Sequence, residues 1–371
     1  MANKLSQNII LLIITIIIFI LFLEIGARVM AVFSPKFLCS TYSDPNNEFL
    51  CQMEAQLSKS LERYNQTTAT TYQDICDKLD PQLGWIPKPN CRTKIYSTNS
   101  KGFRGVKEYT PTKSKKRIVV VGDSFAWGEN SMDNETFPFY LEKLSNESIE
   151  TINMGVHGYG PDQFYIYFTR DGLKYKPDAV VFGLFLPDIH RTIFKVREYF
   201  KPRFILENGK LKLDTDSTNI PDLKTALQMS SEIKKKNRLY SLSYLHGLLN
   251  KAARRAASYR GETSLTLEII DEMHDLLKKE NIEMIVVLIP EQGMVEGNNG
   301  DYYGVVPQIT ANLEKENIGY INLQLVFRNE FKLKNQSLYG GHLKPAGNLI
   351  IARELFNNLH TKKDIFNQKS D

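Results

Sequence analysis

The chain has 371 residues, of which 42% are hydrophobic and 24% are charged, and its formal net charge at pH 7 is +5. This composition is typical of a globular protein and excludes an intrinsically disordered chain. Basic residues are scattered among acidic ones, so the composition gives no support for nucleic-acid binding.

A long apolar segment lies near the N-terminus. Residues 9–23 read IILLIITIIIFILFL, with Thr15 as the only polar side chain, and apolar residues continue beyond Glu24. A bilayer span needs about 20 such residues. Glu24 and Arg28 are four apart and can pair on one helix face near a membrane interface. Because no small-x-small cleavage site stands out after this core, we predict an anchor over residues 1–33 rather than a removed signal peptide.

The four cysteines all lie within the 60 residues after this segment: Cys39, Cys51, Cys76 and Cys91. Four cysteines in a short polar stretch indicate two disulfides in an oxidising compartment. The competing interpretation is a metal site of four thiolates, which the absence of a C-x2-C pair disfavours, so we expect no metal. The sequence leaves three pairings open. The cysteines favour a domain on the periplasmic or extracellular side of the membrane.

Residues 34–110 are expected to form an irregular leader. The stretch DPQLGWIPKPN at 80–90 contains three prolines and a glycine, and proline blocks regular backbone hydrogen bonding. We predict that this leader lies as an extended strap on the main domain, residues 111–371.

Strand and helix patterns alternate through the main domain. Continuous apolar runs predict buried parallel strands at 117–122, 150–155, 178–186, 283–290 and 319–323. Helical patterns occur at 137–144, 162–175, 265–280, 305–316 and 345–359. This order predicts a three-layer α/β/α fold with a parallel, flavodoxin-like sheet of about five strands.

An insertion at about 191–262 separates the third and fourth strands. Asn208-Gly209 within RFILENGKLKL is a two-residue hairpin signal, and the rest is helical to about Arg255. Ligand sites of parallel α/β folds lie beyond the carboxyl ends of the strands. Because the insertion leaves from that edge, we expect it to form a wall or lid over the site.

The first strand runs directly into Gly-Asp-Ser, with Ser124 at the start of a helix. One interpretation is an ordinary turn, with Asp123 as a helix cap. The other is that the turn exposes the Ser124 hydroxyl as a nucleophile. The loop NMGVHGYG, Asn153 to Gly160, follows the second strand, and its glycines either form a plain loop or present backbone amides to an oxyanion.

Two further pieces fall at the same edge of the sheet. FLPDIHR follows the third strand and contributes Asp188 and His190. YGGHLKPAGN precedes the last helix and contributes His342. A lone histidine is often structural, but this one can reach back toward Ser124.

These pieces resemble the conserved blocks of the SGNH (GDSL-type) hydrolase superfamily, in particular its membrane-anchored, exported bacterial members. The resemblance covers about residues 80–358 and includes LGWIPKPN and NSKGFRG, which are similar to the approach segment of the anchored members. It implies that Ser124 is the nucleophile and His342 the general base. It also implies that the Ser124 amide and Gly158 bind the oxyanion, with no metal or cofactor.

The chain departs from that family at two positions. Pro187 stands where the third block places an asparagine, and proline has no amide proton to donate. Gly340 and Tyr339 occupy the positions where the last block carries an aspartate before the histidine. Four residues are possible supports of the site: Asp123, Asn153, Asp188 and His190.

The function expected from this resemblance is a serine esterase that removes acyl groups, O-acetyl above all, from a cell-envelope or exported glycan. One alternative is an acyltransferase that works beside a multispanning membrane O-acyltransferase. A second alternative is a catalytically weakened binding or scaffold subunit, which the two departures favour.

Overall fold

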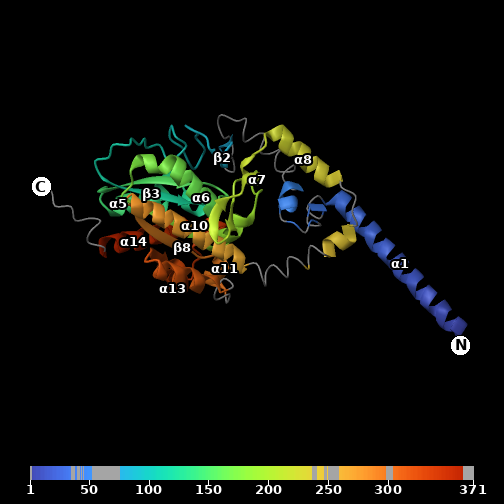
Figure 1. Ribbon diagram of the computed structural model, residues 1–371. Helices are drawn as coiled ribbons and strands as arrows, with labels where there is room; N and C mark the ends of the chain where they lie inside the picture. The colour runs from blue at the N-terminus through green and yellow to red at the C-terminus, as the bar shows by residue number, and fades with distance from the viewer. Residues whose placement is uncertain are drawn as a thin grey trace. The chain divides into compact units, whose positions relative to one another are not determined.

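The computed structural model describes residues 2–34, 38–39, 42, 44, 46–51, 76–235, 240–245, 249, 259–297 and 304–361 (Figure 1). The chain divides into two compact units. The smaller unit consists of Met1–Lys59 and Pro221–Ser258, and the larger consists of Ser60–Ile220 and Tyr259–Asp371.

A five-stranded parallel sheet forms the centre of the larger unit, in the order β4-β3-β5-β8-β9. Its strands are β3 (Lys116–Gly122), β4 (Ile149–Gly155), β5 (Ala179–Phe185), β8 (Glu283–Ile289) and β9 (Gly319–Asn322). This order is that of flavodoxin-like sheets, in which the chain changes direction on either side of the first strand. The predicted fold class and all five predicted strands are therefore confirmed.

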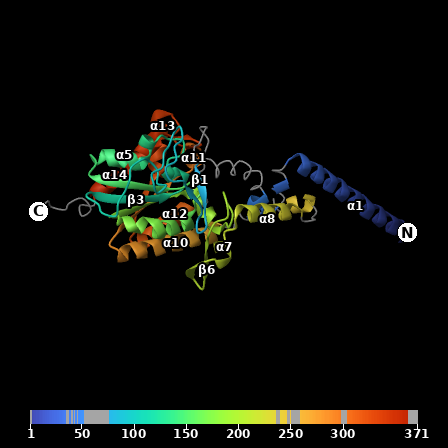
Figure 2. The same cartoon turned by 90° about the horizontal axis from the view of Figure 1, so that it is seen from above.

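Helices cover both faces of this sheet, which explains why the strands are apolar on both sides. One face packs against α5 (Phe137–Leu144), α13 (Leu323–Lys334) and α14 (Pro345–Thr361), around Phe137, Phe327 and Ile351. The other face packs against α6 (Pro161–Tyr167), α10 (Tyr259–Lys279) and α12 (Val305–Lys315). Figure 2 shows α13 and α14 on one side of β3 and α10 and α12 on the other.

Each helical pattern of the main domain corresponds to an observed helix, but one helix is shorter than predicted, and some observed helices, among them the short α11 (Gln292–Glu296), were not predicted. The pattern at 162–175 is one helix only as far as Tyr167, and then continues as two short helical turns, η2 (Phe168–Gly172) and η3 (Leu173–Tyr175). Helix α13 was not predicted. It buries only Leu323 and Phe327, so its apolar face is too narrow to stand out in the sequence.

The strap is the part of the leader over residues 76–110. It begins with an antiparallel hairpin of β1 (Asp77–Asp80) and β2 (Gly84–Pro87), closed by the disulfide Cys76–Cys91. The Trp85 indole donates to the His157 carbonyl oxygen at 2.8 Å, and the Tyr159 hydroxyl donates to the Trp85 carbonyl oxygen at 2.5 Å. The strap therefore holds the glycine-rich loop that follows β4.

The insertion after β5 contributes to both units. Its first part stays in the larger unit and contains the hairpin β6 (Phe204–Glu207) and β7 (Lys210–Leu213), turning at Asn208 and Gly209 as predicted, followed by the short helix α7 (Thr215–Thr218). Its second part begins with α8 (Leu223–Lys235) and belongs to the smaller unit.

The smaller unit joins the N-terminal segment to this second part of the insertion. Helix α1 (Ala2–Phe33) is long and apolar enough, over Gln7–Phe33, to cross a membrane. The Tyr42 hydroxyl donates to the Ile233 carbonyl oxygen at 2.7 Å, and the Ser230 hydroxyl donates to that of Leu50 at 2.8 Å. Glu24 accepts hydrogen bonds from the backbone amides of residues 240 and 241.

The second disulfide, Cys39–Cys51, lies in the smaller unit. Both predicted disulfides therefore form, and each joins two consecutive cysteines of the chain: the first to the second and the third to the fourth. Because all four thiols are used in this way, the alternative of a thiolate metal site is wrong.

Candidate active site

Ser124 stands at the point where β3 gives way to helix α4 (Ser124–Trp127). A Cβ atom at Gly122 would lie 2.8 Å from the Gly183 carbonyl oxygen, so the strand can end here only with glycine. The Asp123 carboxylate caps the helix by accepting from the Phe125 amide at 2.8 Å. Asp123 is thus the cap expected of an ordinary turn, and that turn also places Ser124 at the carboxyl edge of the sheet.

His342 lies beside Ser124. Its Nε2 is 2.9 Å from the Ser124 hydroxyl oxygen. The histidine is on a two-strand hairpin, β10 (Tyr339–Gly340) and β11 (His342–Leu343), whose turn at Gly341 has a φ of +86°. The Tyr339 hydroxyl fixes this hairpin by donating to the Pro290 carbonyl oxygen at 2.7 Å, at the end of β8.

The environment of His342 favours the neutral imidazole. Burial lowers the pKa of His342 below its usual value, while the nearby carboxylates of Glu129 and Asp123 act in the opposite direction. A neutral ring can accept the proton of the Ser124 hydroxyl. That hydroxyl also lies 3.2 Å from Asp123 Oδ2, so a second acceptor is available to it.

Arg191 brings a positive charge to the carboxylates next to Ser124. Its Nη1 is 3.2 Å from Asp123 Oδ2, and it donates to the Tyr159 carbonyl oxygen at 2.8 Å. The same atom forms an ion pair with Asp188 Oδ1 at 2.9 Å. Burial, together with the neighbouring Asp123, raises the pKa of Asp188 well above its usual range. The helical turn η4 (Leu186–Ile193), which has Pro187 near its start, therefore provides an arginine and an acid beneath Ser124.

The glycine-rich loop after β4 lies against the start of α4. The Val156 amide donates to the Gly122 carbonyl oxygen at 3.0 Å, and Gly158 has a φ of +72°. A Cβ atom on Gly158 would lie 2.8 Å from Cγ of Glu198. Glu198 belongs to the insertion, so the insertion packs against this loop. The Asn153 amide donates to the carbonyl oxygens of Ala126 and Trp127 and so ties β4 to α4.

An ion pair that the sequence analysis missed lies next to this loop. The Glu129 carboxylate bonds Nδ1 of His157. Burial opposes the ionisation of Glu129, but the charges of His157, His342 and Arg104 bring its pKa down to about 2. Burial acts to lower the pKa of His157 as well, yet Glu129 raises it above the usual value. Each side chain therefore favours the charged form of the other: the Glu129 carboxylate favours protonated His157, and protonated His157 favours the ionised carboxylate.

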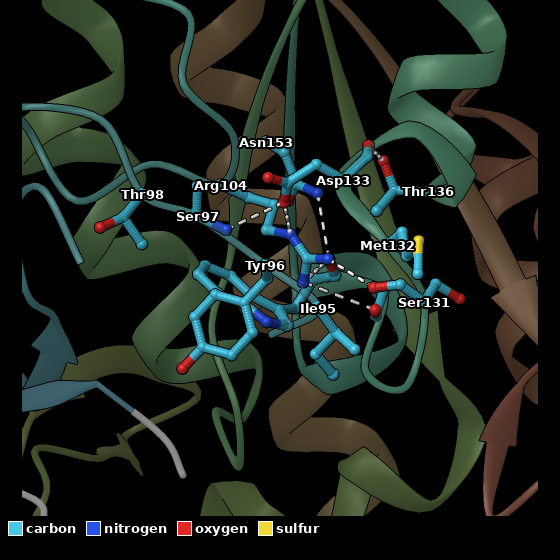
Figure 3. A network of polar contacts seen from close by, with 12 residues as sticks. Ile95, Tyr96, Ser97, Thr98, Arg104, Ser131, Met132, Asp133, Thr136 and Asn153 are labelled. Carbon is cyan, nitrogen blue, oxygen red and sulfur yellow. Dashed lines mark hydrogen bonds and ion pairs between the residues drawn. The ribbon is translucent and has the colours of Figure 1, made fainter. Parts of the chain in front are cut away.

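Arg104 fastens the strap to the turn after α4 (Figure 3). Its guanidinium group donates to Asp133 at 2.7 Å and to the Ser131 carbonyl oxygen at 2.6 Å. The same group lies 5.1 Å from the ring centroids of both Tyr96 and Trp127. Arg104 is almost fully buried. The NSKGFRG motif therefore positions the segment that carries Glu129.

The structure brings most of the sequence-predicted site residues together. Ser124, His342, Asp123 and Asp188 lie in one cluster, with the loop of Asn153 and Gly158 beside it. His190 instead pairs with Glu262 of α10. Sequence reasoning missed three residues: His157 and Arg191, which lie within the NMGVHGYG and FLPDIHR motifs, and Glu129, which follows Ser124 by five positions.

The residues that the structure describes contain no group of three His, Cys, Asp or Glu side chains placed to hold a metal ion.

No family model and no curated protein matches the chain. Solved structures similar to it include a lipolytic protein assigned to the G-D-S-L family from Desulfitobacterium hafniense DCB-2, at 15% identity and a TM-score of 0.38, covering 66% of this chain and 100% of that one. Acetyl xylan esterase AlAXEase aligns at 14% identity and a TM-score of 0.39, over 65% of this chain and 98% of that one. TesA aligns at 12% identity and a TM-score of 0.39, over 68% of this chain and 100% of that one. The G-D-S-L family is the one that the sequence motifs resemble, but at these scores the likeness carries no conclusion about activity, which must follow from the site's own residues.

Proposed function

We propose that the chain is a serine esterase that removes acyl groups, with Ser124 as nucleophile and His342 as general base. The observation that carries this proposal is the 2.9 Å contact between the Ser124 hydroxyl and Nε2 of His342 at the carboxyl edge of the sheet. A serine hydroxyl is a weak nucleophile until an adjacent base takes its proton.

The reaction would proceed in two halves. Ser124 Oγ attacks the ester carbonyl carbon while its proton passes to His342 Nε2, and the leaving alcohol then takes that proton as the C–O bond breaks. Water attacks the acyl-serine in the same way and releases the acid. The backbone amides of Ser124 and Gly158 would stabilise the oxyanion in both halves.

Pro187 makes this oxyanion site poorer by one donor than that of the family. Loss of one such donor typically lowers kcat by about 10²- to 10³-fold. We therefore expect a slow enzyme, or one that is fast only on a substrate that brings its own contacts.

The substrate class proposed is an O-acylated, chiefly O-acetylated, glycan of the cell envelope or of an exported polysaccharide. Its support is the family resemblance together with features of an exported, membrane-attached protein: the apolar helix α1 and the two disulfides. We propose accordingly that the larger unit works on the periplasmic or extracellular side.

An acyltransferase is the second candidate, and helix α1 is the observation that favours it. A domain held at the membrane could receive an acyl group on Ser124 from a multispanning membrane O-acyltransferase. A sugar hydroxyl would then replace water in the second half of the reaction. The third candidate, a scaffold subunit, would need no reactive serine at all.

The test is labelling with a serine-directed fluorophosphonate probe, followed by peptide mapping and an assay on a short-chain aryl acetate. Ser124→Ala should lose both labelling and turnover, while Ser148→Ala, an exposed serine before β4 at the opposite edge of the sheet, should keep both. An unlabelled wild-type protein would favour the scaffold. Labelling with transfer to a sugar acceptor, faster than hydrolysis, would favour the acyltransferase.

A further inference from the structure

Among the described residues, His342 has no acidic hydrogen-bond partner of the kind that a serine–histidine pair normally has. Gly340 and Tyr339 occupy the two positions, two and three residues before the histidine, where the family carries its aspartate, and Gly340 is the one paired with His342 across the hairpin. In the part of the chain that the structure describes, the bond to Ser124 is the only hydrogen bond of the His342 ring. The other ring nitrogen, Nδ1, therefore has no fixed acceptor there.

The turn after α4 touches both the nucleophile and the hairpin of the base. The Glu129 amide donates to the Ser124 carbonyl oxygen at 2.9 Å. The next residue, Asn130, donates from its side-chain amide to the Gly340 carbonyl oxygen at 3.4 Å. The backbone of Glu129 is thus bonded to Ser124, and the side chain of the next residue is bonded to the hairpin that carries His342.

The carboxylate of Glu129 is held in place and carries a charge. One of its oxygens, Oε2, bonds Nδ1 of His157, and no described residue hydrogen-bonds to Oε1. The His157 ring is fixed in turn, since its centroid lies 4.8 Å from that of Trp127 and its backbone carbonyl accepts from Trp85. Because the carboxylate is already held in one orientation, it does not have to reorganise when the reaction begins.

The electrostatic surroundings of His342 single out Glu129 among the nearby groups. Two carboxylates, Glu129 and Asp123, favour protonated His342, while His157 and Arg191 disfavour it. Asp123 is already shared by the Phe125 amide, the Ser124 hydroxyl and Arg191. Of the two carboxylates, Glu129 is thus the one with an oxygen, Oε1, that no described residue hydrogen-bonds.

We propose that Glu129 is the positioning residue that replaces the missing aspartate: its carboxylate, clamped by His157, stabilises the imidazolium that His342 becomes when it takes the proton of Ser124. The inference rests on the proposed serine chemistry. No new bond forms to Glu129, and it keeps its charge throughout. In a serine protease, neutralising the corresponding acid lowers kcat by about 10⁴-fold. A carboxylate that acts on the His342 ring by charge alone, without a hydrogen bond to Nδ1, should have a smaller effect on the rate than such a bonded acid.

The rival explanation is that Glu129 only anchors the glycine-rich loop through His157. The two explanations differ in what happens when an acid is placed beside His342, at whichever of the two family positions can accept one. Gly340 is exposed, and a Cβ atom there would meet only Lys344, at 3.5 Å, so Gly340→Asp has room. Tyr339 is unsuitable because its ring is buried and its hydroxyl donates to Pro290.

The experiment measures fluorophosphonate labelling rate against pH for the full chain and for four variants: Glu129→Gln, His157→Gln, Gly340→Asp and the double variant Glu129→Gln/Gly340→Asp. We expect Glu129→Gln to lower the plateau rate by about 10- to 1,000-fold, below the 10⁴-fold of a bonded acid. Removing the carboxylate also lowers the pKa of His342, so the acid limb of the profile should move to lower pH. Gly340→Asp in that background should restore at least about tenfold of the rate and move the limb back.

The proposal is overturned if Glu129→Gln and His157→Gln lose rate equally and leave the acid limb where it was, or if the double variant labels no faster than Glu129→Gln alone. Circular dichroism and melting temperature check folding. If Glu129→Gln does not fold, Glu129→Asp with and without Gly340→Asp gives the same comparison, since the shorter acid keeps the ion pair with His157. Failure of the serine chemistry would look different: the wild-type protein itself would not label at Ser124.

Discussion

The hydroxyl oxygen of Ser124 lies 2.9 Å from Nε2 of His342, although the two residues are 218 positions apart in the chain. The sheet makes this possible, because β3 delivers Ser124 to the carboxyl edge and a hairpin anchored at the end of β8 returns His342 to the same edge.

The first prediction concerns His342 itself. His342→Ala should reduce fluorophosphonate labelling and ester turnover together by about 1,000-fold or more, because a serine without its base loses most of its reactivity. His360→Ala, an exposed histidine near the end of α14, is the matched control and should label at the wild-type rate. Equal labelling of wild type and His342→Ala would remove His342 from the mechanism.

The second prediction is a pH dependence. The base must be neutral to accept a proton, and burial lowers the pKa of His342 from its usual value of 6.5. Labelling should therefore rise with pH through a midpoint below 6.5 and stay on its plateau at neutral pH. A midpoint clearly above 6.5 would mean that the carboxylates outweigh burial, or that another group is titrating.

The third prediction concerns Arg191 and stability. Arg191→Met leaves Asp123, which is fully buried, without its positive partner. Loss of one partner from a buried pair typically costs about 3–5 kcal/mol in the free energy of unfolding, and urea denaturation measures this loss. Arg353→Met, on the exposed side of α14, should change the unfolding free energy by less than about 0.5 kcal/mol. If the two variants unfold at similar urea concentrations, Arg191 does not stabilise the fold through its ion pair.

The fourth prediction concerns the disulfides. Peptide mapping of the native, unreduced protein should find Cys39 joined to Cys51, and Cys76 joined to Cys91. The Cys76–Cys91 bond closes a loop of about 15 residues, and a loop of that size is stabilised by about 3 kcal/mol. Replacing both of these cysteines by serine should lower the melting temperature and weaken the strap. A Cys51–Cys76 link would refute the pairing.

The fifth prediction concerns the N-terminal helix. Because Gln7–Phe33 is apolar enough to cross a membrane, native protein should stay in the membrane fraction through carbonate washing and should retain its N-terminal residues. A mature N-terminus near Ser34 would show instead that the segment is a cleaved signal.

Much of the fold follows from local patterns. The five strands are apolar on both faces, and this is why each stands out as a short run between turns. The pairing of Ser124 with His342 could be predicted because each lies in a motif of unusual composition. Glu129 and His157 could not be predicted, because they form a pair only when the turn after α4 and the β4–α6 loop come together in the fold. Helix α13 was missed since only two of its side chains enter the core.

The smaller unit is built from two stretches separated by about 160 residues of the other, and this has a practical consequence for making the protein. A soluble version that simply omits the first 59 residues would leave α8 without two hydrogen-bond partners. These are the Leu50 carbonyl oxygen, which accepts from Ser230, and the Tyr42 hydroxyl, which donates to Ile233. The exposed remainder would be open to proteolysis and aggregation. A recombinant version of the larger unit alone therefore needs two changes. The chain should start just before the strap, and the stretch between Ile220 and Tyr259 should be replaced by a short glycine-serine connector.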